Sequence, residues 1–136
     1  MKRQDRFRTN VANVPLQRNL HRDEGWIDMQ VQFLLDERST GSDRFVVGRT
    51  ILPPGARHDP HVHPAAEEFL VVMTGSGRIY TDDGNEPADT GDVVFTPAGL
   101  VHGFDNISDE EVLLIWGWSG AGSLEAAGYE LPPKPR

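Results

Sequence analysis

Apolar and polar residues alternate along residues 26–35, WIDMQVQFLL. In an extended chain, successive side chains point to opposite sides of the strand. One side then carries the apolar residues Ile27, Met29, Val31, Phe33 and Leu35. The other side carries Asp28, Gln30 and Gln32. This alternation is typical of a strand with one buried face, so it predicts a half-buried strand over these residues.

Short apolar segments recur along the rest of the chain and are separated by glycine and proline. The apolar segments are residues 44–52, 69–73, 77–81, 92–96 and 112–118. The separators are PPG at 53–55, GSG at 75–77, DDGN at 82–85 and PAG at 97–99. Many short strands with turn signals between them are typical of a sandwich or a barrel. We therefore predict an all-β fold in a single domain.

Local signals add a hairpin and a short helix to this outline. The segment TDDGNEP at 81–87 predicts a hairpin turn, because Asp, Asn and Gly accept the left-handed backbone that tight turns need. Ser123 is a suitable N-cap for a helix over LEAA, and Gly128 a suitable end. We expect a barrel over 25–118, preceded by an arm over 1–24 and followed by a C-terminal segment, 119–136, with this helix and a proline-rich tail.

Composition excludes several classes of protein. The 136 residues fit one domain, and the absence of cysteine excludes disulfide scaffolds, thiolate metal sites and cysteine nucleophiles. The formal net charge of −8 argues against a nucleic-acid-binding surface. No stretch approaches the ~18 apolar residues of a membrane span, and no apolar run follows the basic N-terminus as in a secretory signal. We therefore expect a cytoplasmic protein with no nucleic-acid or membrane partner.

The segment HVHPAAEEF at 61–69 concentrates groups that bind divalent cations. His61 and His63 project to the same side of a strand, since they are two residues apart. Two surface histidines are common on a strand face, and two adjacent glutamates also suit a solvated turn. His102 favours a metal site over these surface interpretations. It follows a Pro–x–Gly turn that can return the chain onto an adjacent strand, close to the first two histidines. Three imidazoles and one carboxylate suit Fe, Mn, Ni or Co, and Zn is not excluded.

At these residues the sequence resembles the cupin superfamily. Its first motif is matched by Gly55, His61, His63, Glu68 and Gly75 at every fixed spacing. Its second motif is matched by a further set of residues, Gly91, Pro97, Gly99, His102 and Asn106. The resemblance implies a small double-stranded β-helix, or jelly-roll, barrel with one divalent metal ion, Fe or Mn being favoured, inside one mouth.

The resemblance also implies which residues bind the metal. The ligands carry over as His61, His63, Glu68 and His102, which leaves Glu67 outside the coordination sphere. Alternation along the strand agrees, because Glu68 shares its side with Leu70 and Val72. We expect His58 to be exposed, since it lies outside the motif. His21 has no support as a ligand, and Asn106 is expected to hold a turn.

The pocket is expected to be apolar and to take a small hydrophobic or aromatic substrate. Candidate wall residues are Phe69, Met73, Tyr80, Phe95, Phe104, Trp116 and Trp118, of which alternation allows about half to face inward. Arg49 and Arg78 also lie within strand segments. Either could bind a substrate carboxylate if it faced inward, but a solvated strand face is the favoured interpretation.

Two classes of function are compatible with this pattern. The first is a metal-dependent enzyme of dioxygenase-like, other oxidoreductase or lyase type, with Glu68 doubling as general base. The second is a binding module for a small ligand, without turnover; a sugar or acid isomerase or decarboxylase is a further alternative. We also predict a homodimer, because residues 29–35 could supply a strand across an interface and cover an open sheet edge.

Overall fold

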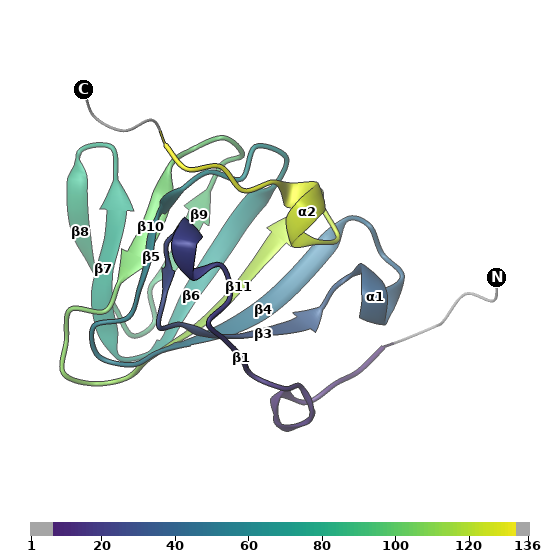
Figure 1. Ribbon diagram of the computed structural model, residues 1–136, viewed down its shortest axis with the longest axis horizontal. Coiled ribbons are helices and arrows are strands. Elements are labelled where there is room, and N and C mark those ends of the chain that lie inside the picture. Colours follow the sequence, from purple (N-terminus) through teal and green to yellow (C-terminus); the bar gives the residue numbers. More distant parts are fainter. Residues whose placement is uncertain (1–6, 133–136) are drawn as a thin grey trace.

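The computed structural model describes residues 7–132, which form two antiparallel β-sheets (Figure 1). The six-stranded sheet has the order β1-β3-β4-β11-β6-β9, with β1 Gln17–Arg18, β3 Gln30–Leu35, β4 Phe45–Leu52, β11 Val112–Ser119, β6 Glu67–Thr74 and β9 Val93–Thr96. The five-stranded sheet has the order β2-β5-β10-β7-β8, with β2 Trp26–Ile27, β5 Arg57–His61, β10 His102–Asp105, β7 Ser76–Thr81 and β8 Gly84–Asp89. The all-β prediction is confirmed.

The single strand predicted over 26–35 is in fact two strands in different sheets. Asp28 has a left-handed backbone with φ of 57°, and this turn carries the chain from β2 in one sheet to β3 in the other. The pairing of β3 with β4 shifts register between Phe33 and Leu35, so that Leu34 is buried as well as Val31. The alternation therefore located the buried residues around Val31 but missed the break.

Gln32 lies on the side of β3 that the alternation assigned to solvent, yet only 2% of it is exposed. Its Nε2 donates hydrogen bonds to the carbonyls of Val11, at 2.8 Å, and Val14, at 2.5 Å. Its Oε1 accepts one from Arg49 Nη1 at 2.9 Å. The N-terminal residues next to the 3₁₀ helix η1, Val11–Asn13, thus cover this face of the sheet.

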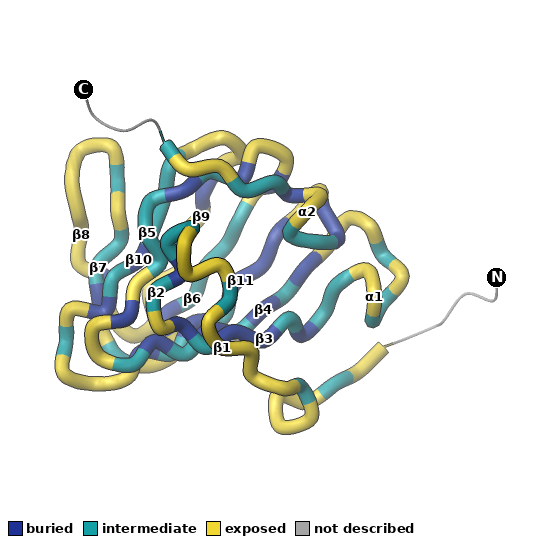
Figure 2. The backbone as a smooth tube through the Cα atoms, in the orientation of Figure 1, coloured by how far each residue is buried: buried dark blue, intermediate teal, exposed yellow. Residues whose placement is uncertain are grey.

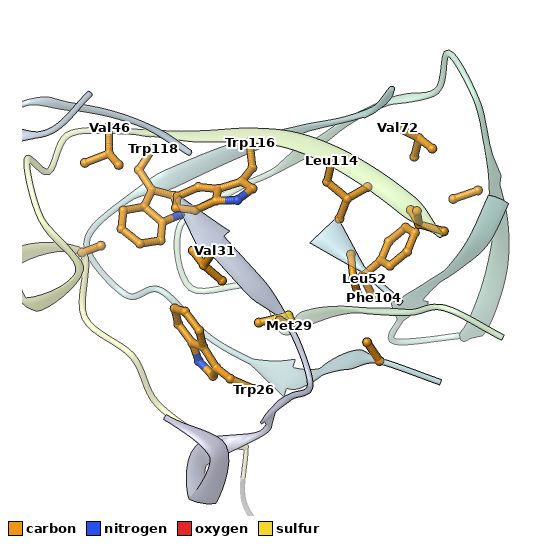
Figure 3. Packing of buried hydrophobic residues seen from close by; sticks show 14 of the residues in the cluster. Trp26, Met29, Val31, Val46, Leu52, Val72, Phe104, Leu114, Trp116 and Trp118 are labelled. Carbon is orange, nitrogen blue, oxygen red and sulfur yellow. The ribbon is translucent and has the colours of Figure 1, made fainter. Parts of the chain in front are cut away.

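The apolar core lies between the two sheets (Figure 3), and Figure 2 shows where the buried residues fall along the strands. Figure 3 shows Trp26, Trp116 and Trp118 pointing into this space from β2 and β11. The close approach of Trp116 requires glycine at position 48 on the paired strand β4, because a Cβ there would lie 2.1 Å from the indole. Trp116 Nε1 is satisfied by a hydrogen bond to Thr50 Oγ1 at 2.8 Å, so the buried indole leaves no unpaired donor.

The local turn and helix predictions hold. Strands β7 and β8 form the hairpin predicted over 81–87, with Thr81 opposite Gly84. Helix α2, Leu124–Ala127, begins after Ser123, whose side chain accepts a hydrogen bond from Ala126 N, and ends at Gly128. Helix α1, Glu37–Thr40, was not predicted, although Asp36 and Gly41 are a cap pair that the sequence contains. Within residues 7–132, no helix is long and apolar enough to cross a membrane.

Candidate metal centre

Three histidines, two at or just after the end of β5 and one from the neighbouring strand β10, meet at one end of the five-stranded sheet. His61 ends β5, His63 follows two residues later, and His102 begins β10 directly opposite His61 in the antiparallel ladder. The Pro–x–Gly turn acts as the sequence suggested, since the N–H of Gly99 donates to the His63 carbonyl at 3.0 Å. One potential ligand nitrogen from each of the three rings lies within 4.8 Å of the other two.

Each of the three imidazoles is held by a backbone carbonyl on its Nδ1. The acceptors are the carbonyls of Asp59 for His61, at 2.7 Å, Gly128 for His63, at 2.7 Å, and Leu100 for His102, at 2.9 Å. A carbonyl only accepts, so in the neutral rings Nδ1 carries the proton and Nε2 offers a lone pair. All three Nε2 atoms are buried; those of His61 and His63 have no hydrogen-bond partner, and that of His102 faces the Glu68 carboxylate. Buried nitrogen lone pairs that converge in this way fit a divalent metal ion.

Glu68, and not Glu67, lies beside the histidines. Glu68 Oε2 is 3.1 Å from His102 Nε2, and Glu68 Oε1 is 3.7 Å from His63 Nε2. Trp118 Nε1 donates to Glu68 Oε1 at 3.1 Å and fixes the carboxylate from the neighbouring strand β11. Glu67 is exposed on the opposite face, where it accepts a hydrogen bond from Ser119 Oγ. This is the arrangement that alternation along β6 predicted.

Burial and neighbouring charges shift the pKa values of these groups in different directions. Burial lowers the pKa of His61 and of His63, which keeps both rings neutral at pH 7. Burial also acts to raise the pKa of Glu68, but His102 and His63 outweigh it and hold that pKa below its usual value. For His102, burial acts to lower the pKa, yet the Glu68 carboxylate raises it overall. Glu68 is therefore ionised and faces neutral or cationic imidazoles.

The prediction that His58 is exposed is wrong. His58 is half-buried and lines the same cavity, with its ring stacked on His61 at a centroid distance of 3.7 Å. Trp26 from β2 and Tyr129 from the C-terminal segment pack around it, and His58 Nε2 lies 3.3 Å from Tyr129 Oη. Burial lowers the pKa of His58 to about 3. The burial of His58 could not be predicted from its neighbours in the sequence, because Trp26 and Tyr129 are both distant from it in the chain.

The centre opens into an apolar cavity of about 50 Å³ between the sheets. Of the candidate wall residues, Phe104, Trp116 and Trp118 line it; unpredicted members include Trp26, Met29, Val31, Leu52 and Leu114. Met73, Tyr80 and Phe95 are exposed instead. Tyr80 and Phe95 line a second cavity of about 130 Å³, whose wall also includes Glu68 and His102. Glu68 and His102 therefore line both cavities.

Neither arginine that was considered as a substrate ligand lines the first cavity. Arg49 is hydrogen-bonded to Gln32, as described above, and Arg78 Nη2 donates to Asp105 Oδ2 at 3.0 Å. Both therefore have protein partners outside the cavity. Asn106 holds a turn, as expected: its Nδ2 donates to the carbonyls of Leu52 and Glu110, both at 2.8 Å.

Comparison with known families supports the motif assignment. The sequence model of the family described as "Cupin domain" matches residues 48–118, which is just over half of the chain and includes all three histidines. The chain belongs to the cupin family. The two sheets are accordingly the two halves of the cupin double-stranded β-helix.

Curated cupin relatives carry several different names. The chain is 33% identical over 86 residues to Protein SchB of Streptomyces halstedii, covering 63% of this chain and 62% of SchB. It is 28% identical over 96 residues to Polyketide synthase CurC of Streptomyces cyaneus, covering 71% of this chain and 62% of CurC. It is also 27% identical over 85 residues to the Oxalate-binding protein of Thermotoga maritima, covering 62% of this chain and 70% of that protein. The matches to SchB and CurC thus span about three-fifths of those two proteins.

Solved structures confirm the fold. The polyketide cyclase RemF from Streptomyces resistomycificus superposes with a TM-score of 0.75 at 21% identity, covering 92% of this chain and 84% of RemF. A predicted oxalate decarboxylase from Thermotoga maritima superposes with a TM-score of 0.74 at 20% identity, covering 83% of this chain and 98% of that one. Proteins with such different names share one scaffold, so function has to be argued from the site.

Proposed function

We propose that this cupin is a metal-dependent enzyme that removes a proton from the carbon next to a carbonyl group in a small, largely apolar substrate. The observation that carries the proposal is the position of Glu68. Its ionised carboxylate shares an apolar cavity with three buried imidazole nitrogens, to which the backbone offers no hydrogen bond. The names of CurC and RemF support carbonyl chemistry, since polyketides are built from repeated carbonyl groups.

His61, His63, His102 and Glu68 would hold one divalent ion, with Fe or Mn favoured because the donor set combines nitrogen with a harder carboxylate oxygen. When bound, the ion supplies Lewis acidity to a carbonyl or enolate oxygen. Glu68 accepts the proton on a carboxylate oxygen, while Trp118 Nε1 keeps that carboxylate oriented. The indoles and Phe104 exclude water from the reacting carbon.

The size of the cavity limits what enters it. A volume of about 50 Å³ is several-fold below the roughly 300–1,000 Å³ of pockets that enclose a drug-sized ligand. This space takes the reactive end of a substrate but not a whole drug-sized molecule. A larger substrate therefore has to reach outward, and the second cavity beside Glu68 and His102 offers apolar wall residues for its remainder.

We expect the metal-loaded protein to catalyse exchange of the acidic C–H of a 1,3-dicarbonyl probe with deuterium in D₂O, equally under air and under nitrogen. Proton removal requires no oxidant, so oxygen should not affect the rate. The measurement is proton NMR of the probe with Fe- and Mn-loaded samples, alongside an oxygen electrode. Oxygen consumption coupled to cleavage of the probe would support the dioxygenase alternative, and the absence of both reactions would contradict an enzyme of either kind.

A binding module without turnover is the second candidate, and the similarity to the Oxalate-binding protein favours it. Against oxalate itself, the described residues that line the first cavity include no lysine or arginine to pair with a dianion. Tight binding of a dicarboxylate by the metal-loaded protein, with no exchange of the dicarbonyl probe, would select this function over the first.

We also propose that the chain forms a homodimer, although not through β3, which is paired with β1 on one side and β4 on the other. The opposite edge strand β9 exposes Val93 and Phe95, which are 72% and 63% accessible.

Sedimentation should give twice the 15.1 kDa chain mass. Phe95→Lys should shift the protein to monomer, whereas Ile107→Lys, on an equally exposed apolar residue in a loop, should not. A wild-type monomer at micromolar concentration would contradict the proposal.

A further inference from the structure

The segment Ser123–Glu130 lies beyond the residues that match the cupin domain, yet it is hydrogen-bonded to residues 62–65, which follow His61 in the histidine motif. Val62 and Glu130 exchange two backbone hydrogen bonds, of 2.8 and 3.0 Å. Ala65 N donates to the Ala127 carbonyl at 3.0 Å. Between these contacts, the Gly128 carbonyl accepts the hydrogen bond from His63 Nδ1 at 2.7 Å. The end of α2 and the residues that follow it, up to Glu130, are therefore hydrogen-bonded alongside residues 62–65.

The Gly128 carbonyl has little freedom to move. Gly128 N donates to the Leu124 carbonyl at 2.9 Å and ends α2, while Glu130, two residues later, is bonded to Val62. The backbone of Gly128 has φ 79° and ψ 156°, a region that is essentially restricted to glycine. A Cβ at this position would also lie 2.8 Å from Pro64 Cγ and 2.9 Å from Pro64 Cδ. Any other residue would therefore be strained here, and either Pro64 or the Gly128 backbone would have to shift.

Tyr129 makes a second contact between this segment and the centre. Its ring stacks on His61 at a centroid distance of 5.0 Å and an interplanar angle of 19°. Its hydroxyl donates to the Glu24 carbonyl at 2.6 Å, which ties the ring to the 3₁₀ helix η2, Arg22–Glu24. The ring of His61 thus packs against both His58 and Tyr129, whose own centroids lie 5.8 Å apart, and these contacts restrain the plane in which its Nε2 points.

We propose that Gly128 and Tyr129 are positioning residues of the metal centre: the Gly128 carbonyl selects the His63 tautomer with Nε2 free, and the Tyr129 ring sets the orientation of His61. This inference rests on the proposed metal centre. Without the carbonyl, the proton of His63 can move to Nε2, and that tautomer offers no lone pair at the site. Loss of such a partner typically lowers metal affinity by about 10–100-fold.

The test compares Gly128→Ala with Gly41→Ala in the full chain. Gly41 is a matched control because it also ends a short helix with a positive φ, of 76°, but has no heavy atom within 4 Å of an added Cβ and lies away from the centre. Two readouts are taken: nitrogen-15 NMR of the imidazoles without metal, and Co²⁺ titration followed by visible absorption. We expect Gly128→Ala to populate the Nε2–H tautomer of His63, lower Co²⁺ affinity about 10–100-fold and alter the Co²⁺ spectrum. Gly41→Ala should leave the His63 tautomer, the Co²⁺ affinity and the Co²⁺ spectrum unchanged.

Tyr129 supplies an independent pair of variants should Gly128→Ala fail to fold. Tyr129→Phe keeps the stacked ring and should retain the Co²⁺ spectrum, whereas Tyr129→Leu removes the ring and should change it. An Nδ1–H tautomer and wild-type affinity in Gly128→Ala, an equal loss in Gly41→Ala, or a Tyr129→Leu spectrum identical to wild type would overturn the inference. A wild-type protein that binds no Co²⁺ but shows the expected tautomers would instead overturn the metal centre.

Discussion

Glu68→Gln is expected to lower turnover by about 10²–10⁴-fold even when the metal site is fully loaded. The amide preserves the shape of the side chain, and its oxygen can still accept the hydrogen bond from Trp118 Nε1. It cannot accept a proton from the substrate carbon. The variant should also bind Mn and Fe more weakly than wild type, because these harder ions lose a negatively charged oxygen ligand. Metal content and deuterium exchange are measured on the same sample.

Glu67→Gln is the matched control for this variant. It makes the same chemical change one residue away, on an exposed side chain that accepts a hydrogen bond from Ser119 Oγ. It should retain wild-type metal content and turnover. If Glu68→Gln at full occupancy were as active as Glu67→Gln, then Glu68 would be at most a dispensable ligand and the proposed proton transfer would be wrong.

Replacing His102 by alanine should lower metal affinity by more than roughly 100-fold, since loss of a residue that only supports a ligand already costs about 10–100-fold. The remaining donors would be His61 and His63, which lie two residues apart, and Glu68. His102 is the only histidine of the three that comes from β10, and it stands opposite His61 across the ladder. Its removal therefore opens one whole side of the centre. Metal analysis after purification without chelator gives the readout.

His21→Ala provides the comparison for His102→Ala. His21 contacts Trp26 but lies outside the histidine cluster, so its removal should leave metal content unchanged. Thermal unfolding of both variants without metal checks that the fold is kept. Equal metal content in the two variants would show that His102 is not a ligand.

The sequence predicted the residues whose signal is local and missed those defined by remote contacts. The short strands, the 81–87 hairpin and the Ser123 cap follow from alternation and turn chemistry within a few residues. The convergence of His61, His63 and His102 followed from motif spacing. The break at Asp28 was missed, because a polar residue that fits the alternation gives no sign of a left-handed backbone.

The supporting contacts of the site were the least visible in the sequence. The partners of the three Nδ1 atoms are backbone carbonyls, which have no side-chain signature. His58 was expected to be exposed because neither Trp26 nor Tyr129, which cover it, is near it in the chain. Gln32 was placed in solvent by alternation and is buried by the N-terminal segment instead. In each case the deciding partner lies more than 15 residues away or is a main-chain atom.

The chain contains three tryptophans, and all three line the cavity next to the histidine cluster. Trp118 also donates its indole N–H to Glu68, so its environment depends directly on that carboxylate. The intrinsic fluorescence of the protein therefore originates around a single site, with no indole elsewhere to add background. The intensity or wavelength of this emission should change when a metal ion binds, when a substrate enters or when the charge of Glu68 changes. Each of these events can therefore be followed in the unlabelled protein by fluorescence.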